Sequence, residues 1–151
     1  MKIKTKPYGE IEVSEKQKIL FSDGIIGFEG ITSYFLIDSK EGPYYWLQSE
    51  EHPELAFILI NPRIFMTGYK LMVQSEDLEA IGVEEQSDLL DFAIVTVPED
   101  HKKISANLMG PIIINKKTRV ARQVISENDE YGVKHYIMEE AEKQAQLVES
   151  T

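Results

Sequence analysis

Short runs of alternating or continuous apolar residues dominate the chain, and turn-forming residues separate them at regular intervals. Lys2–Thr5 and Glu10–Val13 flank a Pro-Tyr-Gly turn, a pattern typical of a β-hairpin. Tyr34–Ile37 and Tyr44–Gln48 flank a second turn that contains Gly and Pro. The first half of the chain is therefore expected to form paired antiparallel strands.

Further strands are expected in the rest of the chain. Leu55–Ile60 is apolar throughout, so both of its faces should be buried, and Asn61-Pro62 ends it. Tyr69–Val73 alternates between apolar and polar residues, as a half-exposed strand does. The remaining expected strands are Ile19–Phe21, Phe92–Val97, Ile112–Ile114, Val120–Ile125 and Tyr131–Met138.

Helical signals are few. Ser75–Gly82 predicts one or two turns of helix, with Ser75 as the N-cap and Gly82 just beyond the C-terminus. Glu139–Val148 is rich in Glu, Ala, Gln and Lys and is followed by Ser150 and Thr151, so residues 139–151 form a polar helix or a flexible tail. About nine short strands with one or two short helices predict an all-β, mainly antiparallel fold, a small barrel or sandwich in one domain over residues 1–138.

Composition narrows the classes of partner. The 151 residues include 26 Asp and Glu against 16 Lys and Arg, a formal net charge of −10, and no Cys. The absence of Cys excludes disulfides, thiolate metal sites and a cysteine nucleophile. The negative charge disfavours nucleic acid and anionic membranes, because both are bound through Lys and Arg. The basic N-terminus lacks the apolar region of a signal peptide, so we expect a cytoplasmic protein, and the strong net charge favours a monomer.

The acidic residues are unevenly distributed. Residues 76–100 contain nine acids and no base, and six of them lie close together: Glu76, Asp77, Glu79, Glu84, Glu85 and Asp88. One interpretation is a solvated, solubilising surface. The other is a docking surface for a basic partner.

Signals of enzymatic chemistry are weak. His52, His101 and His135 lie far apart, and no metal-binding spacing, nucleophile elbow or phosphate-binding loop is present. We therefore expect no catalytic residue, no metal and no cofactor. The alternative is a small-molecule-binding β-barrel or a jelly-roll-type enzyme, which would require His and carboxylate side chains to converge in space.

Three adjacent aromatic residues, Tyr44, Tyr45 and Trp46, cannot all point into one core. At least one of them should be exposed or lie at a rim. Ordinary packing in the barrel is one interpretation, and an aromatic anchor in a protein interface is the other.

Several motifs then resemble, in order and at compatible spacing, those of the FliW family of flagellar assembly factors. They begin with Leu20–Gly30, which reads LFSDGIIGFEG, and Trp46–Ser49. The most specific match is Ser105–Asn115, which reads SANLMGPIIIN, although the family usually has Thr at position 105 and often Ala at position 110. Further matches are Leu55–Phe57, Pro62, Ile94–Pro98, Arg122–Ile125 and Tyr131, so the resemblance covers roughly residues 3–138.

The resemblance implies a barrel-like β fold and a non-enzymatic regulator of flagellar assembly. Proteins of this family bind flagellin in the cytoplasm and also bind CsrA, a small basic RNA-binding repressor of flagellin translation, and the two partners alternate. The six clustered acids are the candidate contacts for CsrA. The candidate contacts for flagellin are Phe21, Phe28, Tyr44, Tyr45 and Trp46. Four motif residues, Gly27, Asn107, Pro111 and Asn115, are expected to have structural roles.

Overall fold

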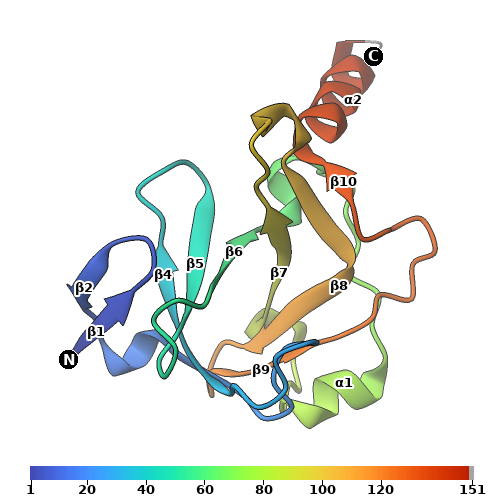
Figure 1. Ribbon diagram of the computed structural model, residues 1–151. Helices are drawn as coiled ribbons and strands as arrows, with labels where there is room; N and C mark the ends of the chain where they lie inside the picture. The colour runs from blue at the N-terminus through green and yellow to red at the C-terminus, as the bar shows by residue number, and fades with distance from the viewer. Residues whose placement is uncertain (150–151) are drawn as a thin grey trace.

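The computed structural model describes residues 1–149, in which ten strands and two α-helices form most of the regular structure (Figure 1). The strands are β1 (Lys2–Thr5), β2 (Gly9–Glu12), β3 (Lys18–Phe21), β4 (Ser33–Asp38), β5 (Tyr44–Ser49), β6 (Ala56–Ile60), β7 (Leu89–Thr96), β8 (Ser105–Asn115), β9 (Val120–Gln123) and β10 (His135–Tyr136). The α-helices are α1 (Ser75–Ala80) and α2 (Ile137–Glu149). Four single-turn 3-10 helices are η1 (Glu15–Gln17), η2 (Pro62–Ile64), η3 (Gln86–Asp88) and η4 (His101–Lys103).

Seven strands close into a barrel in the hydrogen-bonded order β8-β7-β6-β5-β4-β3-β9, because β9 pairs with β8 as well as with β3. The β3–β9 pair is parallel and the other pairs of the ring are antiparallel. Closure leaves the ring without an exposed edge that could recruit a foreign strand. The predicted β-rich, mainly antiparallel fold is confirmed, in the barrel rather than the sandwich form. The parallel pair makes the sheet mixed.

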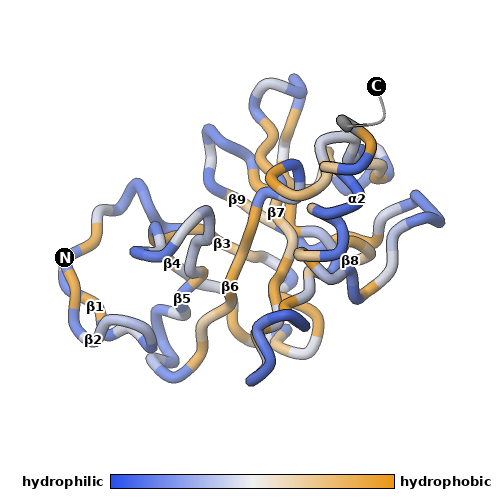
Figure 2. The backbone as a smooth tube through the Cα atoms, turned by 90° about the horizontal axis from the view of Figure 1, so that it is seen from above, coloured by the Kyte–Doolittle hydropathy of each residue, from blue (hydrophilic) through white to orange (hydrophobic). Residues whose placement is uncertain are grey.

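Buried hydrophobic side chains fill the interior of the barrel, and every strand of the ring contributes to them: Ile19, Phe21, Tyr34, Leu47, Leu59, Phe92, Ile112, Ile114 and Ala121. In Figure 2, where the colour gives the hydropathy of each residue, β6 is hydrophobic along its length, and the outer loops are mostly hydrophilic. A barrel of this size has room inside for side chains or for one small ligand. Here side chains occupy that room, and partners must therefore be bound on the outer surface.

The predicted helix at residues 75–82 is confirmed as α1, but its predicted N-cap is wrong. The N-cap is Gln74, which makes no side-chain capping hydrogen bond, whereas Ser75 already lies inside the helix. The C-terminal end is as expected, with Gly82 at φ +71°. Its N–H donates to the carbonyl of Glu79, and the N–H of Val83 donates to that of Leu78, which together form a Schellman motif.

Two predicted strands are corrected. Tyr69–Val73 alternates in burial as expected, with Tyr69 buried and Lys70 exposed, but it belongs to no ladder. The N–H of Lys70 donates instead to the hydroxyl of Tyr131, at 2.9 Å. Of Tyr131–Met138, only β10 is a strand, because α2 begins at Ile137.

The polar segment at the C-terminus is helical as far as it is described. α2 extends to Glu149, whereas residues 150 and 151 of the predicted tail lie outside the described residues. Within residues 1–149, no helix combines the length and the apolar character needed to cross a membrane.

Candidate protein-binding surfaces

The acidic stretch does not form one surface. Glu99 and Asp100 follow β7 at the upper end of the barrel in Figure 1, whereas α1 and η3 lie at the lower end. Asp91 lies on β7, where Arg63 neutralises it. The six predicted acids do remain together on α1, η3 and the loop between them. We call this group of Glu76, Asp77, Glu79, Glu84, Glu85 and Asp88 the acidic face.

Two members of the acidic face have basic partners. The Nε atom of Arg122 lies 3.4 Å from Asp77, and Nζ of Lys117 lies 3.3 Å from Asp88. Both carboxylates are mostly buried, with 18% and 16% of their side chains exposed. These two aspartates attach the acidic face to the barrel through Arg122 on β9 and through Lys117 in the β8–β9 turn.

The four glutamates of the acidic face, Glu76, Glu79, Glu84 and Glu85, are exposed and form no ion pair within residues 1–149. Their negative charges therefore face solvent. Such a surface attracts a basic partner over roughly a Debye length, about 8–10 Å at moderate salt.

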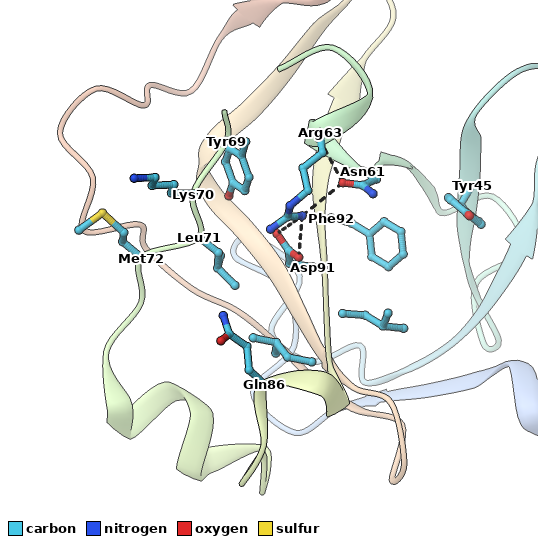
Figure 3. A pocket seen from close by; sticks show the side chains of 12 residues that line it. Tyr45, Asn61, Arg63, Tyr69, Lys70, Leu71, Met72, Gln86, Asp91 and Phe92 are labelled. Atoms are coloured by element: carbon cyan, nitrogen blue, oxygen red, sulfur yellow. Dashed lines mark hydrogen bonds and ion pairs between the residues drawn. The ribbon is translucent and has the colours of Figure 1, made fainter. Parts of the chain in front are cut away.

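Next to the acidic face, an open pocket of ≈ 720 Å³ separates the segment after η2 from β7 (Figure 3). Nη1 of Arg63 donates to both carboxylate oxygens of Asp91, at 3.0 and 3.2 Å, and to Oδ1 of Asn61, at 3.3 Å. The Tyr69 ring stacks on Tyr131 with 4.9 Å between centroids. Burial raises the pKa of the Tyr69 hydroxyl, which stays protonated at neutral pH. No sequence motif indicates this pocket, because Arg63 and Asp91 are 28 residues apart.

The aromatic candidates are distributed over several environments. Tyr45 packs edge-on against Phe92 in the barrel core, at 5.3 Å, whereas Tyr44 and Trp46 each pack against a different cluster outside it. All three are half-buried, which agrees with the expectation that they cannot share one core. Tyr44 and Trp46 also line a surface hollow of ≈ 360 Å³ beside η4.

Phe21 is removed from the candidate surface, because its side chain is completely buried in the barrel core. Its ring packs edge-on against Tyr34, at 5.2 Å. Phe28, in the loop after β3, is different: it is 38% exposed and packs edge-on against Phe57, at 5.3 Å. Of the two predicted phenylalanines, only Phe28 is accessible to a partner.

The β3–β4 loop has a conformation that requires glycine. Gly27 has φ +90°, and its N–H donates to the carboxylate of Glu29, at 3.1 Å. This hydrogen bond, together with one from the backbone N–H of Glu29 itself, lowers the pKa of that carboxyl. Gly24 has φ +70°, and a Cβ atom there would lie 2.5 Å from the backbone of Glu29. Both glycines therefore allow the loop to fold back on itself.

The other motif residues shape β8 and the turn after it. Phe92 of β7 pairs with Ile112, and Ile94 pairs with Asn107, so residues 108–111 of β8 lie opposite Ala93 alone. Oδ1 of Asn107 accepts the N–H groups of Met109 and Gly110 in this kink, at 3.0 and 2.9 Å. Pro111 ends this kink. Because position 111 has no partner in the β7–β8 register, the missing N–H of proline removes no hydrogen bond between these strands.

Asn115 organises the β8–β9 turn. Its Oδ1 atom accepts the N–H groups of Lys117 and Thr118, and its Nδ2 atom donates to the carbonyl of Ile81, at 2.9 Å. This buried amide thus connects the turn to the end of α1 and helps to fix the acidic face relative to the barrel.

The histidines do not converge on a site. Nε2 of His135 accepts the N–H of Gly132, at 2.8 Å, and His52 lies in the β5–β6 loop with Nδ1 3.4 Å from Glu54. Among residues 1–149, no three His, Asp or Glu side chains lie close enough to share a metal ion.

The chain is similar to known proteins over most of its length. A family model described as "FliW protein" matches residues 2–137. The "Flagellar assembly factor FliW" of Ruminiclostridium cellulolyticum is 42% identical over 95% of this chain and 99% of its own length. The protein of the same name from Treponema denticola is 43% identical over 93% of this chain and 95% of its own. A crystal structure of the flagellar assembly factor FliW superposes with a TM-score of 0.84 at 35% identity, covering 91% of this chain and 96% of that one.

The filled barrel and its outer surfaces, considered with these relatives, define a non-enzymatic assembly factor. The chain belongs to the FliW family of flagellar assembly factors. The resemblance found in the sequence motifs is thereby confirmed, and the enzymatic alternative is set aside.

Proposed function

We propose that this protein is a cytoplasmic, monomeric regulator of flagellar assembly that binds flagellin and the translational repressor CsrA in alternation. While it holds CsrA, flagellin mRNA is translated; when flagellin accumulates and occupies the protein, CsrA is released to repress. Family membership supports the pair of partners. The observation that carries the proposal within this chain is the acidic face, whose four exposed glutamates form no ion pair with any described residue.

The acidic face is suited to CsrA because a protein that holds RNA must present Lys and Arg to its phosphates. Opposite charge speeds the encounter and selects the partner, although exposed ion pairs add only about 0.2–1 kcal/mol each. After docking, the same glutamates would repel RNA phosphates. CsrA could thus be antagonised without the RNA site being covered.

Charge reversal tests this part of the proposal. The variant Glu84→Lys/Glu85→Lys should weaken CsrA binding by about tenfold or more, because two attractions become repulsions. Isothermal titration calorimetry at two or three salt concentrations measures the effect. The affinity of the wild-type protein should also fall as salt rises.

The matched control is Glu51→Lys/Glu142→Lys, which makes the same change in net charge at two exposed sites away from the acidic face. It should bind CsrA nearly as the wild type does. If both double variants lost the same affinity for CsrA, the effect would come from net charge alone and not from the acidic face. Unchanged binding in Glu84→Lys/Glu85→Lys would place the CsrA contact elsewhere.

A further inference from the structure

A cluster of exposed apolar side chains lies on one side of the barrel. It consists of five large hydrophobic residues with exposed fractions of 38–62%: Ile26, Phe28, Met109, Ile125 and Val133. Four of the five line a hollow of ≈ 350 Å³ whose lining also includes Phe57 of β6, and Phe28 packs on that ring. We call these five residues the apolar patch. Contiguous exposed apolar surface of this kind marks sites of protein interaction.

Hydrogen bonds hold the apolar patch together from three separate segments. The carbonyl of Met109 accepts the N–H of Ser126, at 2.8 Å, and its own N–H donates to Gly132, at 3.1 Å. Ile125 precedes Ser126 and Val133 follows Gly132 in the chain. These two hydrogen bonds therefore hold Met109 between Ile125 and Val133. The patch is therefore a built surface and not a set of mobile loop side chains.

Gln123 attaches the third segment. Its Oε1 atom accepts the N–H of Ile26, and its Nε2 atom donates to the carbonyl of Gly110, both at 3.0 Å. A Cβ atom at position 110 would lie 3.0 Å from the same Nε2 atom, so glycine leaves room for this bridge. Thus the loop after β3 and the kink of β8, both parts of the family motifs, meet at the patch.

The loops around the apolar patch are acidic. Residues 22–32 and 125–134 contain five acids and one base: Asp23, Glu29, Glu127, Asp129, Glu130 and Lys134. All six side chains are exposed. A complementary partner thus combines an apolar surface with flanking Lys or Arg side chains. An amphipathic helix provides both, with apolar residues at every third or fourth position and charges along its sides.

We propose that the apolar patch is where this protein binds flagellin, by receiving one amphipathic helix of the flagellin monomer with its basic flanks against the acidic loops. This inference rests on the proposed function and specifies its flagellin site. The patch replaces Phe21 and the Tyr44–Trp46 region as the main contact, and it retains Phe28.

The test is the affinity for purified monomeric flagellin, measured by isothermal titration calorimetry with CsrA titrated in parallel. Ile26→Lys/Val133→Lys should weaken flagellin binding at least about tenfold and leave CsrA binding within about twofold. The single variant Ile125→Ser, which adds no charge, should weaken it in the same direction. The melting temperature should change little, since both lysines replace side chains that are 62% exposed.

The matched control is Ile64→Lys/Met138→Lys, which places two lysines on exposed apolar residues outside the patch (58% and 48% exposed). It should bind flagellin as the wild type does. Wild-type affinity for flagellin in both patch variants would overturn the inference and leave the proposed function standing. A wild-type protein that binds no flagellin would overturn both. A wild-type dimer that the patch variants convert to monomers without loss of flagellin binding would make the patch a contact between copies of this chain.

Discussion

At the scale of single residues, Tyr34 shows how the core tolerates a polar atom. Its side chain is fully buried in the barrel, and its hydroxyl has no hydrogen-bond partner within the described chain. Burial raises the pKa of this hydroxyl from 10.0 to about 12. A buried hydroxyl without a partner has lost its hydrogen bonds to water and gained none in the protein. Its removal should therefore leave the stability of the fold unchanged or raise it.

Tyr34→Phe is therefore expected to leave the free energy of unfolding at pH 7 unchanged or to raise it by up to about 1 kcal/mol. In the wild type, the unfolded chain releases the Tyr34 proton near pH 10, whereas the folded protein holds it to about pH 12. Stability falls across that interval, and the variant should lose this part of the decline. Urea denaturation at pH 7, 10 and 11.5 measures both effects. A loss above about 1 kcal/mol at pH 7 would mean that the hydroxyl has a partner.

At the scale of elements, the kink of β8 connects the sequence motif to the surface. Asn107 accepts two N–H groups that the strand register leaves without a partner on β7, and Met109 then points outward at 40% exposure. The same kink carries the carbonyl of Gly110 that Gln123 binds. A change at Asn107 should consequently affect both stability and the apolar patch.

Asn107→Ala should lower the free energy of unfolding by about 1–3 kcal/mol, because the N–H of Gly110 loses its acceptor and the N–H of Met109 keeps only the carbonyl of Gly132. It should also weaken flagellin binding. Asn107→Asp keeps an oxygen acceptor at the same position and should restore most of both properties. Thermal unfolding and flagellin titration of the two variants provide the comparison. Equal behaviour of Asn107→Ala and the wild type would show that the kink does not depend on this side chain.

Most strands could be predicted from the sequence because their patterns are local. Tyr34–Ile37, Leu55–Ile60 and Phe92–Val97 all lie within strands, apart from one residue at an end of the last two. Tyr69–Val73 has the right alternation but no ladder partner, and periodicity alone cannot supply one. The parallel pairing of β3 with β9 could not be predicted from local patterns either, because it joins Leu20 to Val120, far apart in the chain.

At the scale of the whole molecule, the acidic face and the apolar patch are neighbours. Arg122 lies 3.4 Å from Asp77 of the acidic face and 3.6 Å from Asp23 in the β3–β4 loop, which carries Ile26. On the other side, the N–H of Glu127 donates to Met72, and Glu127 lines a common hollow with Glu84 and Glu85. A partner on one surface therefore approaches the space that a partner on the other would occupy.

The two surfaces differed in how far the sequence could predict them. The acidic face was visible because its acids follow one another along the chain, and only their division from Asp91, Glu99 and Asp100 required the fold. The apolar patch was not visible beyond Phe28. Ile26, Met109 and Val133 lie in three segments far apart in the chain, and only the barrel and the bond from Gln123 bring them together.

The central claim is that flagellin and CsrA alternate on this protein, and a competition measurement tests it most directly. Equimolar amounts of this protein, flagellin and CsrA would be mixed at concentrations above both dissociation constants. The molecular masses of the complexes would then be measured by mass photometry or light scattering. Because the two surfaces adjoin, we predict two binary complexes whose proportions shift toward flagellin as flagellin is added. A stable ternary complex with both partners bound to one copy would contradict the account.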